Sequence, residues 1–259
     1  MIAKQESPGP EKMESGHLFI AGPCRHKPVE QRCIQCIVDS SSFFSHLSLP
    51  AKLALQKKMH LRRYNRRTRI YCEGDVSDHF HILMSGEVKN YKSLSNGHQQ
   101  IYKLVIIPGD LIDCEDLFGG RYTGTAEALT PVSLCVIEKE VFKTIGRQYG
   151  EITELLLHSM SRNLNEYIRH IANLGQKSAI ERVASYLIFL NNTHQENNLD
   201  GDHLCESLTR VELADMLGVT QRTLIRCLKK MESDNIIGLT REGFVINDYS
   251  TLLHISEGN

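Results

Sequence analysis

The sequence lacks any apolar run close to the roughly 20 residues that a membrane-spanning helix needs, and its first residues do not follow the pattern of a secretory signal peptide. It also lacks an excess of either charge, because it contains 30 Lys and Arg and 31 Asp and Glu, which gives a formal net charge of −1. No nucleophile–base pair, phosphate-binding loop or catalytic carboxylate arrangement stands out. These absences predict a cytoplasmic protein that is not an enzyme and has no membrane partner. Any nucleic-acid surface must then come from local clusters of basic residues.

The 259 residues are enough for two modest domains, each with its own core. Residues 1–45 begin with Pro, Gly, Ser and Glu in no hydrophobic period, which predicts a flexible N-terminal segment that also carries cysteines. Over residues 46–150 a short helix at 49–59 and a basic stretch precede apolar runs that are separated by turn pairs such as Gly86-Glu87 and Asn96-Gly97. Turn signals at spacings of about 8–12 residues predict a β-sandwich or roll.

The hydrophobic period changes at Glu151. From there, apolar residues recur at alternating steps of three and four, which is the spacing of a coiled-coil seam. These residues are Leu157, Met160, Leu164, Tyr167, Ile171 and Leu174. A helix packed only on its own domain is the alternative, but its apolar stripe is usually wider. We therefore expect a dimerisation helix over residues 151–175 that joins two copies into a homodimer.

Residues 176–259 contain the strongest motif of the chain, LTRVELADMLGVTQRTLIRCLKKM, from Leu208 to Met231. Gly218 stands where a tight turn between two helices needs a residue that tolerates positive φ, and Thr220 can cap the second helix. A hairpin pattern over 236–246 follows and would form a wing. This pattern predicts a winged helix-turn-helix.

The second helix of the motif carries basic and polar side chains and no acid in its first ten residues. A helix of this kind that enters the major groove of DNA uses its N-terminal residues on base edges and later ones on phosphates. The predicted DNA-binding residues are Gln221, Arg222, Thr223, Arg226, Lys229 and Lys230. Arg222 and Arg226 suit guanine, whereas Lys229 and Lys230 suit backbone phosphates.

Four segments follow one another in the chain. They are a β-rich segment that contains FHILMSGEVKNYK and PGDLI, a long helix, the stretch ERVASYLIFL, and the helix-turn-helix. In this order they resemble the family of the cyclic-AMP receptor protein and the fumarate-and-nitrate-reduction regulator, the CRP/FNR family, over about residues 40 to 250. The resemblance implies an α+β fold with an N-terminal cyclic-nucleotide-binding-like β-roll, a long dimerisation helix and a C-terminal winged helix-turn-helix. It also implies a transcription regulator that binds a palindromic operator in double-stranded DNA as a homodimer and contacts RNA polymerase.

Two branches of this family differ in their sensors. The cyclic-AMP branch keeps a Gly-Glu pair and an Arg-Ser pair for ribose and phosphate, and the matching positions here are Asp113-Cys114 and Tyr122-Thr123. The cyclic phosphate would therefore lose its matched arginine, although Arg121 is one residue away. The other branch senses oxygen under anaerobic regulation through an iron–sulfur cluster, held by three N-terminal cysteines and one cysteine of the roll. By resemblance the ligands would be Cys24, Cys33, Cys36 and Cys135, and the cofactor a [4Fe–4S] cluster.

Two departures from the oxygen-sensing branch stand in the sequence. The N-terminal cysteines are spaced C-x8-C-x2-C rather than C-x2-C-x5-C. In the recognition helix, Arg222 replaces a glutamate of that branch, while Arg226 is retained. The DNA half-site is therefore expected to differ from the usual one.

Other readings of the cysteines remain open. Four thiolates would also bind zinc, a redox disulfide could form between Cys33 and Cys36, and Cys114 is a rival fourth ligand. Cys72, Cys205 and Cys227 suit packing positions. Haem on roll histidines is a further alternative. A function from another class is a small molecule bound in the roll pocket, with the cysteines structural or zinc-binding.

Overall fold

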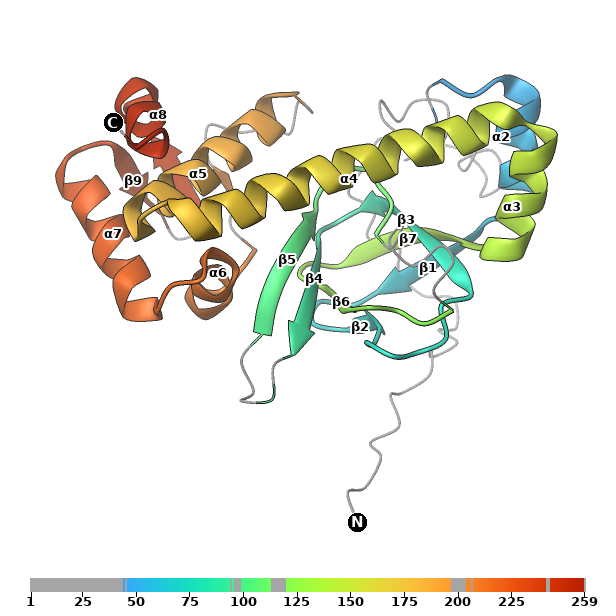
Figure 1. Cartoon of the computed structure of the whole chain (residues 1–259), viewed down its shortest axis with the longest axis horizontal. Helices are drawn as coiled ribbons and strands as arrows, with labels where there is room; N and C mark the ends of the chain where they lie inside the picture. Colours follow the sequence, from blue (N-terminus) through green and yellow to red (C-terminus); the bar gives the residue numbers. More distant parts are fainter. Residues whose placement is uncertain are drawn as a thin grey trace, which may run out of the picture.

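The computed structural model describes residues 44, 46–93, 95, 99–112, 120–196, 204–205, 207–240 and 243–258. Over these residues the chain forms a β-roll, a long helix and a smaller C-terminal domain (Figure 1). The predicted ligands Cys24, Cys33 and Cys36, and the rival Cys114, lie outside the described residues.

The roll consists of two antiparallel sheets, with strand orders β1-β7-β3 and β2-β6-β4-β5. The strands are β1 His60–Tyr64, β2 Arg69–Tyr71, β3 His79–Ser85, β4 Val88–Ser93, β5 Gln99–Val105, β6 Thr125–Ala128 and β7 Val132–Glu138. The predicted β-rich region is thereby confirmed. Strand β1 was not expected, because it lies in the basic stretch and its side chains are mostly exposed, so no apolar alternation marks it.

Two short helices, α2 (Leu49–Gln56) and α3 (Lys139–Gln148), pack at one end of the roll. Helix α2 begins with Pro50 in its first turn, where proline is tolerated, and ends before the residue 59 expected from the sequence. Phe80 and Phe142 pack edge-to-face at a centroid distance of 5.0 Å in the core beneath these helices. The two helices close that end of the roll.

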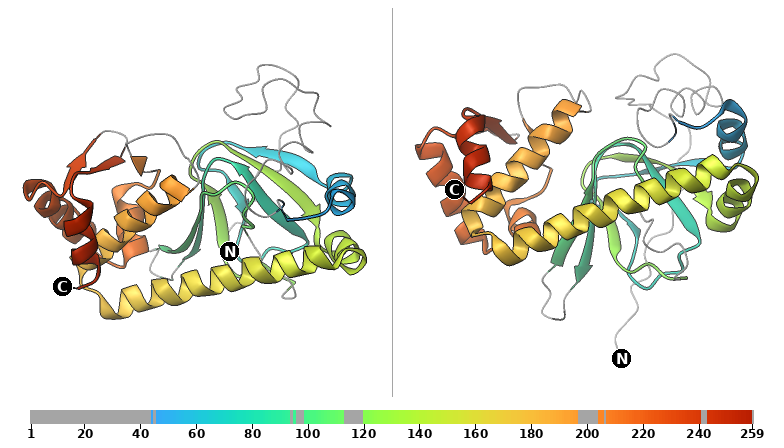
Figure 2. Two further views of the ribbon diagram at one scale, coloured as in Figure 1. Left: turned by 90° about the horizontal axis from the view of Figure 1, so that it is seen from above. Right: turned by 45° about the horizontal axis from the view of Figure 1, so that its top comes forward.

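Helix α4 (Gly150–Gln176) has 27 residues and therefore a length of about 40 Å. It runs along the roll and continues to the C-terminal domain, as both views of Figure 2 show. The side that faces the roll buries Ile152, Leu156, Ser159 and Asn163. A single rigid element thus touches both halves of the molecule.

The C-terminal domain contains helices α5 (Ala179–Glu196), α6 (Arg210–Leu217), α7 (Gln221–Ser233) and α8 (Tyr249–Ser256), with strands β8 (Leu204–Cys205), β9 (Ile237–Leu239) and β10 (Gly243–Ile246). The expected hairpin is confirmed by the antiparallel pairing of β9 with β10. Strand β8 and helix α8 were not expected, although Asp248, which accepts from Thr251 N at 3.0 Å, is a recognisable cap for α8. Within the described part of the chain, no helix combines the length and the apolar character needed to cross a bilayer.

Candidate nucleic-acid interface and sensor site

Local hydrogen bonds define where the two helices of the predicted motif begin. At α6, Thr209 Oγ1 accepts from Glu212 N at 3.2 Å, while Glu212 Oε2 accepts from Thr209 N at 2.8 Å, which completes a capping box. At α7, Thr220 Oγ1 accepts from Thr223 N at 3.2 Å, so the predicted cap is confirmed. Both helices therefore start at positions that the sequence encodes locally.

The turn between α6 and α7 depends on Gly218. Its backbone has φ 61° and ψ 39°, the left-handed conformation that glycine adopts most easily. A Cβ atom at this position would lie 2.9 Å from Leu174 Cδ2. Arg182 Nη1 donates to the carbonyl oxygens of Leu217 at 2.9 Å and Gly218 at 3.2 Å, and so satisfies the end of α6.

We expect Gly218→Ala to destabilise the C-terminal domain by about 1–2 kcal/mol, since a left-handed alanine alone costs about that much. Urea unfolding followed by circular dichroism measures the change. Gly150→Ala is the matched control, because nothing lies within 4 Å of a Cβ there and alanine suits a helix start. Equal stability of the two variants would contradict the role assigned to Gly218.

Helix α7 has an apolar inner face and a basic outer face. The inner face buries Leu224, Cys227, Leu228 and Met231, so Cys227 is a packing residue as expected. Burial raises the pKa of the Cys227 thiol, which keeps it neutral. Of the predicted DNA-binding residues, those exposed are Gln221, Arg222, Arg226, Lys229 and Lys230, while Thr223 is half-buried.

The outer face of α7 carries a net positive charge. Lys230 Nζ lies 2.9 Å from Asp234 Oδ2, an exposed pair of the i,i+4 kind that contributes little to stability and can open at small cost. The Thr223 hydroxyl lies 2.9 Å from the Thr220 hydroxyl, at the N-terminal end of the helix. The arrangement offers arginines near the N-terminus for base edges and lysines further along for phosphates.

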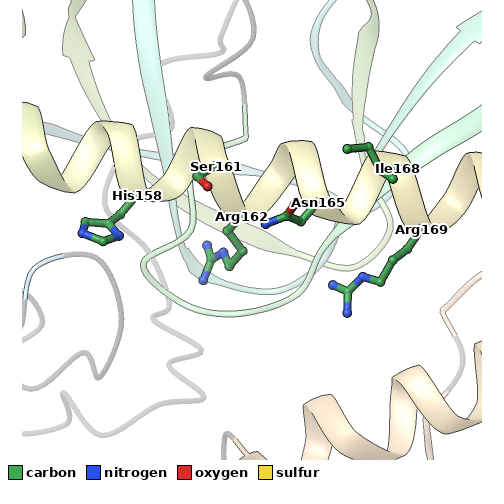
Figure 3. A pocket seen from close by; sticks show the side chains of 6 residues that line it. All are labelled: His158, Ser161, Arg162, Asn165, Ile168 and Arg169. Carbon is green, nitrogen blue, oxygen red and sulfur yellow. The ribbon is translucent and has the colours of Figure 1, made fainter.

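The outward side of α4 carries an uncovered apolar stripe. Leu157, Leu164, Ile168 and Ile171 are 61%, 58%, 55% and 67% exposed. Beside them runs a groove of about 570 Å³ (Figure 3). The groove is lined by His158, Ser161, Arg162, Asn165, Ile168 and Arg169. A large exposed apolar stripe on one helix indicates a protein interface.

Three of the six predicted seam residues contact other parts of their own chain. Met160 packs against the core at the α2–α3 end of the roll, and the Tyr167 ring lies 6.0 Å from that of Tyr102 in β5. Leu174 lies against the turn at Gly218. Ile168, which belongs to the exposed stripe, falls outside the predicted set because it does not fit the three-and-four spacing counted from Leu157 through Met160. The exposed residues also follow steps of four and three from Leu157, but through positions 161 and 168 rather than 160 and 167. Only the exposure of the side chains distinguishes these two sets.

The predicted ligand Cys135 lies in β7, opposite Ile82 of β3, and is 2% exposed. It belongs to one packed core together with Phe44, at the start of the described chain, and with Leu156 of α4. Among the described residues no three His, Cys, Asp or Glu side chains are grouped to hold a metal ion. Of the four predicted ligands, only Cys135 lies among the described residues, in the same core as Phe44.

Aromatic side chains fill the interior of the second sheet. The rings of Tyr71 and Tyr122 stack at a centroid distance of 3.8 Å, and the Tyr122 hydroxyl donates to His79 O at 3.1 Å. Tyr122 is 4% exposed. The position matched to the phosphate-binding arginine of the cyclic-AMP branch is therefore occupied by a buried tyrosine.

Comparisons with known proteins agree with this architecture. Residues 61–149 match a family model described as the cyclic nucleotide-binding domain, and residues 181–255 match the Crp-like helix-turn-helix domain. The chain is 25% identical to the nitrogen fixation regulation protein FixK of Bradyrhizobium diazoefficiens over 219 residues, which cover 83% of this chain and 90% of that protein. It is 22% identical to the fumarate and nitrate reduction regulatory protein of Vibrio cholerae over 252 residues, which cover 97% and 96%. The solved structure of FixK2 from Bradyrhizobium japonicum has a similar fold, with a TM-score of 0.70 and 23% identity over 76% of this chain and 96% of that one.

A sensor-type β-roll, a long helix and an exposed basic recognition helix together define a DNA-binding transcription regulator. The chain belongs to the CRP/FNR family of transcription regulators. Its matched relatives are regulators rather than enzymes, and the predicted fold class is confirmed.

Proposed function

We propose that this chain is a homodimeric regulator of anaerobic genes that senses oxygen through an iron–sulfur cluster bound by Cys24, Cys33, Cys36 and Cys135. What supports the proposal is the shared core of Cys135, Phe44 and Leu156. Cys36 precedes Phe44 by eight residues, a stretch that spans at most about 29 Å when extended. Sulfur donors upstream of Phe44 can therefore reach the neighbourhood of Cys135.

The core around Cys135 also explains how a signal would reach the dimer helix. Ile152 and Leu156 of α4 belong to that core, as do residues of α2 and α3. An iron–sulfur cluster, when bound, supplies an oxygen-labile link between the N-terminal segment and the roll. Any change in packing around Phe44 is transmitted directly to the first turns of α4, because cores are close-packed and respond to small displacements.

We propose the dimer seam on the exposed side of α4. It would consist of Leu157, Ser161, Leu164, Ile168 and Ile171, which keep the steps of four and three that a parallel helix pair needs. On the other side of α4, Met160 and Tyr167 would pack against the roll and Leu174 against the C-terminal domain, which would hold the helix in place. Two recognition helices about 34 Å apart would then read a palindromic operator, and RNA polymerase would be the further partner. We place this activity in the cytoplasm.

The cluster is tested on protein purified without air. The wild-type chain is expected to be brown, to hold about four iron and four sulfide ions per chain, and to bleach on aeration. Cys33→Ser and Cys36→Ser should each remove most of the iron, while Cys72→Ser, at a half-buried position in the roll, should retain it. Colourless protein with stoichiometric zinc would refute the proposal.

The match of residues 61–149 to the cyclic nucleotide-binding domain favours one alternative, a small ligand bound in the roll. In that case Cys33→Ser would leave regulation intact. The buried Tyr122 speaks against a cyclic phosphate at the matched position, because it stands where the cyclic-AMP branch has its arginine. Titration of the apo protein with cyclic AMP by calorimetry tests the cyclic-nucleotide form of this alternative, and we expect no heat of binding.

A further inference from the structure

Glu212, in the first turn of α6, is paired with two cations of the roll. Its Oε1 accepts a hydrogen bond from Lys89 Nζ of β4 at 2.6 Å, and it also accepts from Arg67 Nη1. Its Oε2 accepts from Arg67 Nη2 at 3.0 Å. The Arg67 guanidinium therefore donates hydrogen bonds to both carboxylate oxygens of Glu212. This is the strong bidentate geometry of an arginine–carboxylate pair.

The same carboxylate is also part of the capping box of α6. Oε2 accepts from the Thr209 backbone N–H at 2.8 Å and from the Thr209 hydroxyl at 2.9 Å. A carboxylate has about four lone-pair sites, so these five donors saturate Glu212. Docking to the roll and starting the helix thus depend on one side chain.

Charges at this junction are balanced only when the two domains are together. Glu127 Oε1 of the roll lies 3.5 Å from Arg67 Nη1 and 3.6 Å from Lys89 Nζ, so two cations face two anions. The Lys89 side chain is 3% exposed. If residue 212 were neutral in this docked arrangement, two cations and one anion would remain around a nearly buried ammonium group, which is unfavourable.

Apolar packing accompanies the ion pairs. Tyr91, Ile101 and Leu129 of the roll belong to the same core cluster as Leu213 and Leu217 of α6. Burial pushes the pKa of Glu212 upward, but hydrogen bonds from Arg67, Lys89 and Thr209 outweigh it and lower the pKa to about 2. Because this pKa lies below the ordinary value, the contact is fully formed at neutral pH and is lost only as the pH falls toward 2.

We propose that Glu212 is a positioning residue for DNA reading, which holds α6 on the roll through Arg67 and Lys89 and so sets the direction of α7. Helix α7 follows α6 after the turn that begins at Gly218, and that turn rests on Leu174 of α4. The basic face of α7 remains exposed in this docked arrangement, so docking is compatible with DNA binding. Release of α6 would give the recognition helix rotational freedom that DNA binding must remove again.

A double-mutant cycle on the full-length protein tests this role. The variants are Glu212→Gln, Arg67→Gln and the double variant, and the probe is the duplex that the wild-type chain enriches from a random library. Glutamine at position 212 preserves the capping box, so the helix start is retained. Each single variant should bind about tenfold more weakly, within the usual range of coupling between sites. The double variant should bind no more weakly than Glu212→Gln, because that variant has already lost the charge pair with Arg67.

Two further measurements separate positioning from simple stability. Glu140→Gln removes an exposed carboxylate that is paired with Lys143 inside α3, and should leave DNA binding unchanged. Amide exchange in β4 should be faster in Glu212→Gln, although the substitution lies in the other domain. DNA affinity of Arg67→Gln or Glu212→Gln within twofold of the wild type, or effects that multiply in the double variant, would overturn the proposal.

Discussion

Ile168→Glu is expected to convert the protein into a monomer and to reduce binding to its selected duplex roughly 100-fold or more. Ile168 is 55% exposed in the single chain, so a glutamate there costs the monomer little. In the dimer it would place two unpaired carboxylates in an apolar seam, at a cost of at least about 3 kcal/mol. Sedimentation equilibrium measures the association, and fluorescence anisotropy measures the binding of DNA.

Val76→Glu is the matched control for that experiment. Val76 is an exposed apolar residue of the roll, 63% exposed, that lies outside α4. The same change of chemistry there should leave both the dimer and its DNA affinity intact. If Ile168→Glu remained a dimer, the seam proposed on the exposed side of α4 would be wrong. If, in addition, a folded Met160→Glu protein were a monomer, the seam would lie on the side of Met160.

The recognition motif could be predicted from sequence because its determinants are local. The caps at Thr209 and Thr220, the turn at Gly218 and the basic outer face of α7 lie within a few residues of the contacts they make. The same holds for most strands of the roll, whose turn residues punctuate alternating runs. Strand β1 was the exception, since an edge strand with exposed side chains has no pattern to detect.

The sequence alone does not choose between the predicted seam and the one proposed from the exposed stripe, and the reason is geometric. Leu157, Leu164 and Ile171 fit two sets of steps, one completed by Met160 and Tyr167 and the other by Ser161 and Ile168. Both sets satisfy the coiled-coil spacing. The position of the roll distinguishes the two sets, because it covers one side of α4 and leaves the other exposed, and the proposed seam follows the exposed side.

The junction at Glu212 was beyond sequence reasoning altogether. An acid three residues after a threonine indicates a capping box, which fully accounts for it locally. Arg67 is 145 positions away, in a basic stretch that resembles an ordinary solvated surface. Because the capping box already explains Glu212, nothing in the sequence indicates a second, long-range partner. The contact with Arg67 is visible only in the folded structure.

Arg226→Ala should weaken binding to the selected duplex by about 2 kcal/mol or more, roughly 30-fold, because a homodimer loses one base contact in each half-site and each such contact contributes about 1–3 kcal/mol. Arg226 is exposed on α7, so the stability of the domain should change by less than about 0.5 kcal/mol. The loss should be accompanied by relaxed preference at one symmetric pair of positions. Competition among duplexes that differ at single positions measures both effects.

Lys229→Ala provides the contrast that makes this result informative. A phosphate contact carries no base preference, so its loss should weaken all duplexes alike. It should also reduce the slope of log affinity against log salt by about 2 per dimer, since two counterion-releasing contacts disappear. If Arg226→Ala behaved in this way and Lys229→Ala altered base preference, α7 would lie in the groove with the opposite polarity. The direct reading assigned to its N-terminal arginines would then be wrong, because the geometry of the motif permits base contact at only one end of the helix.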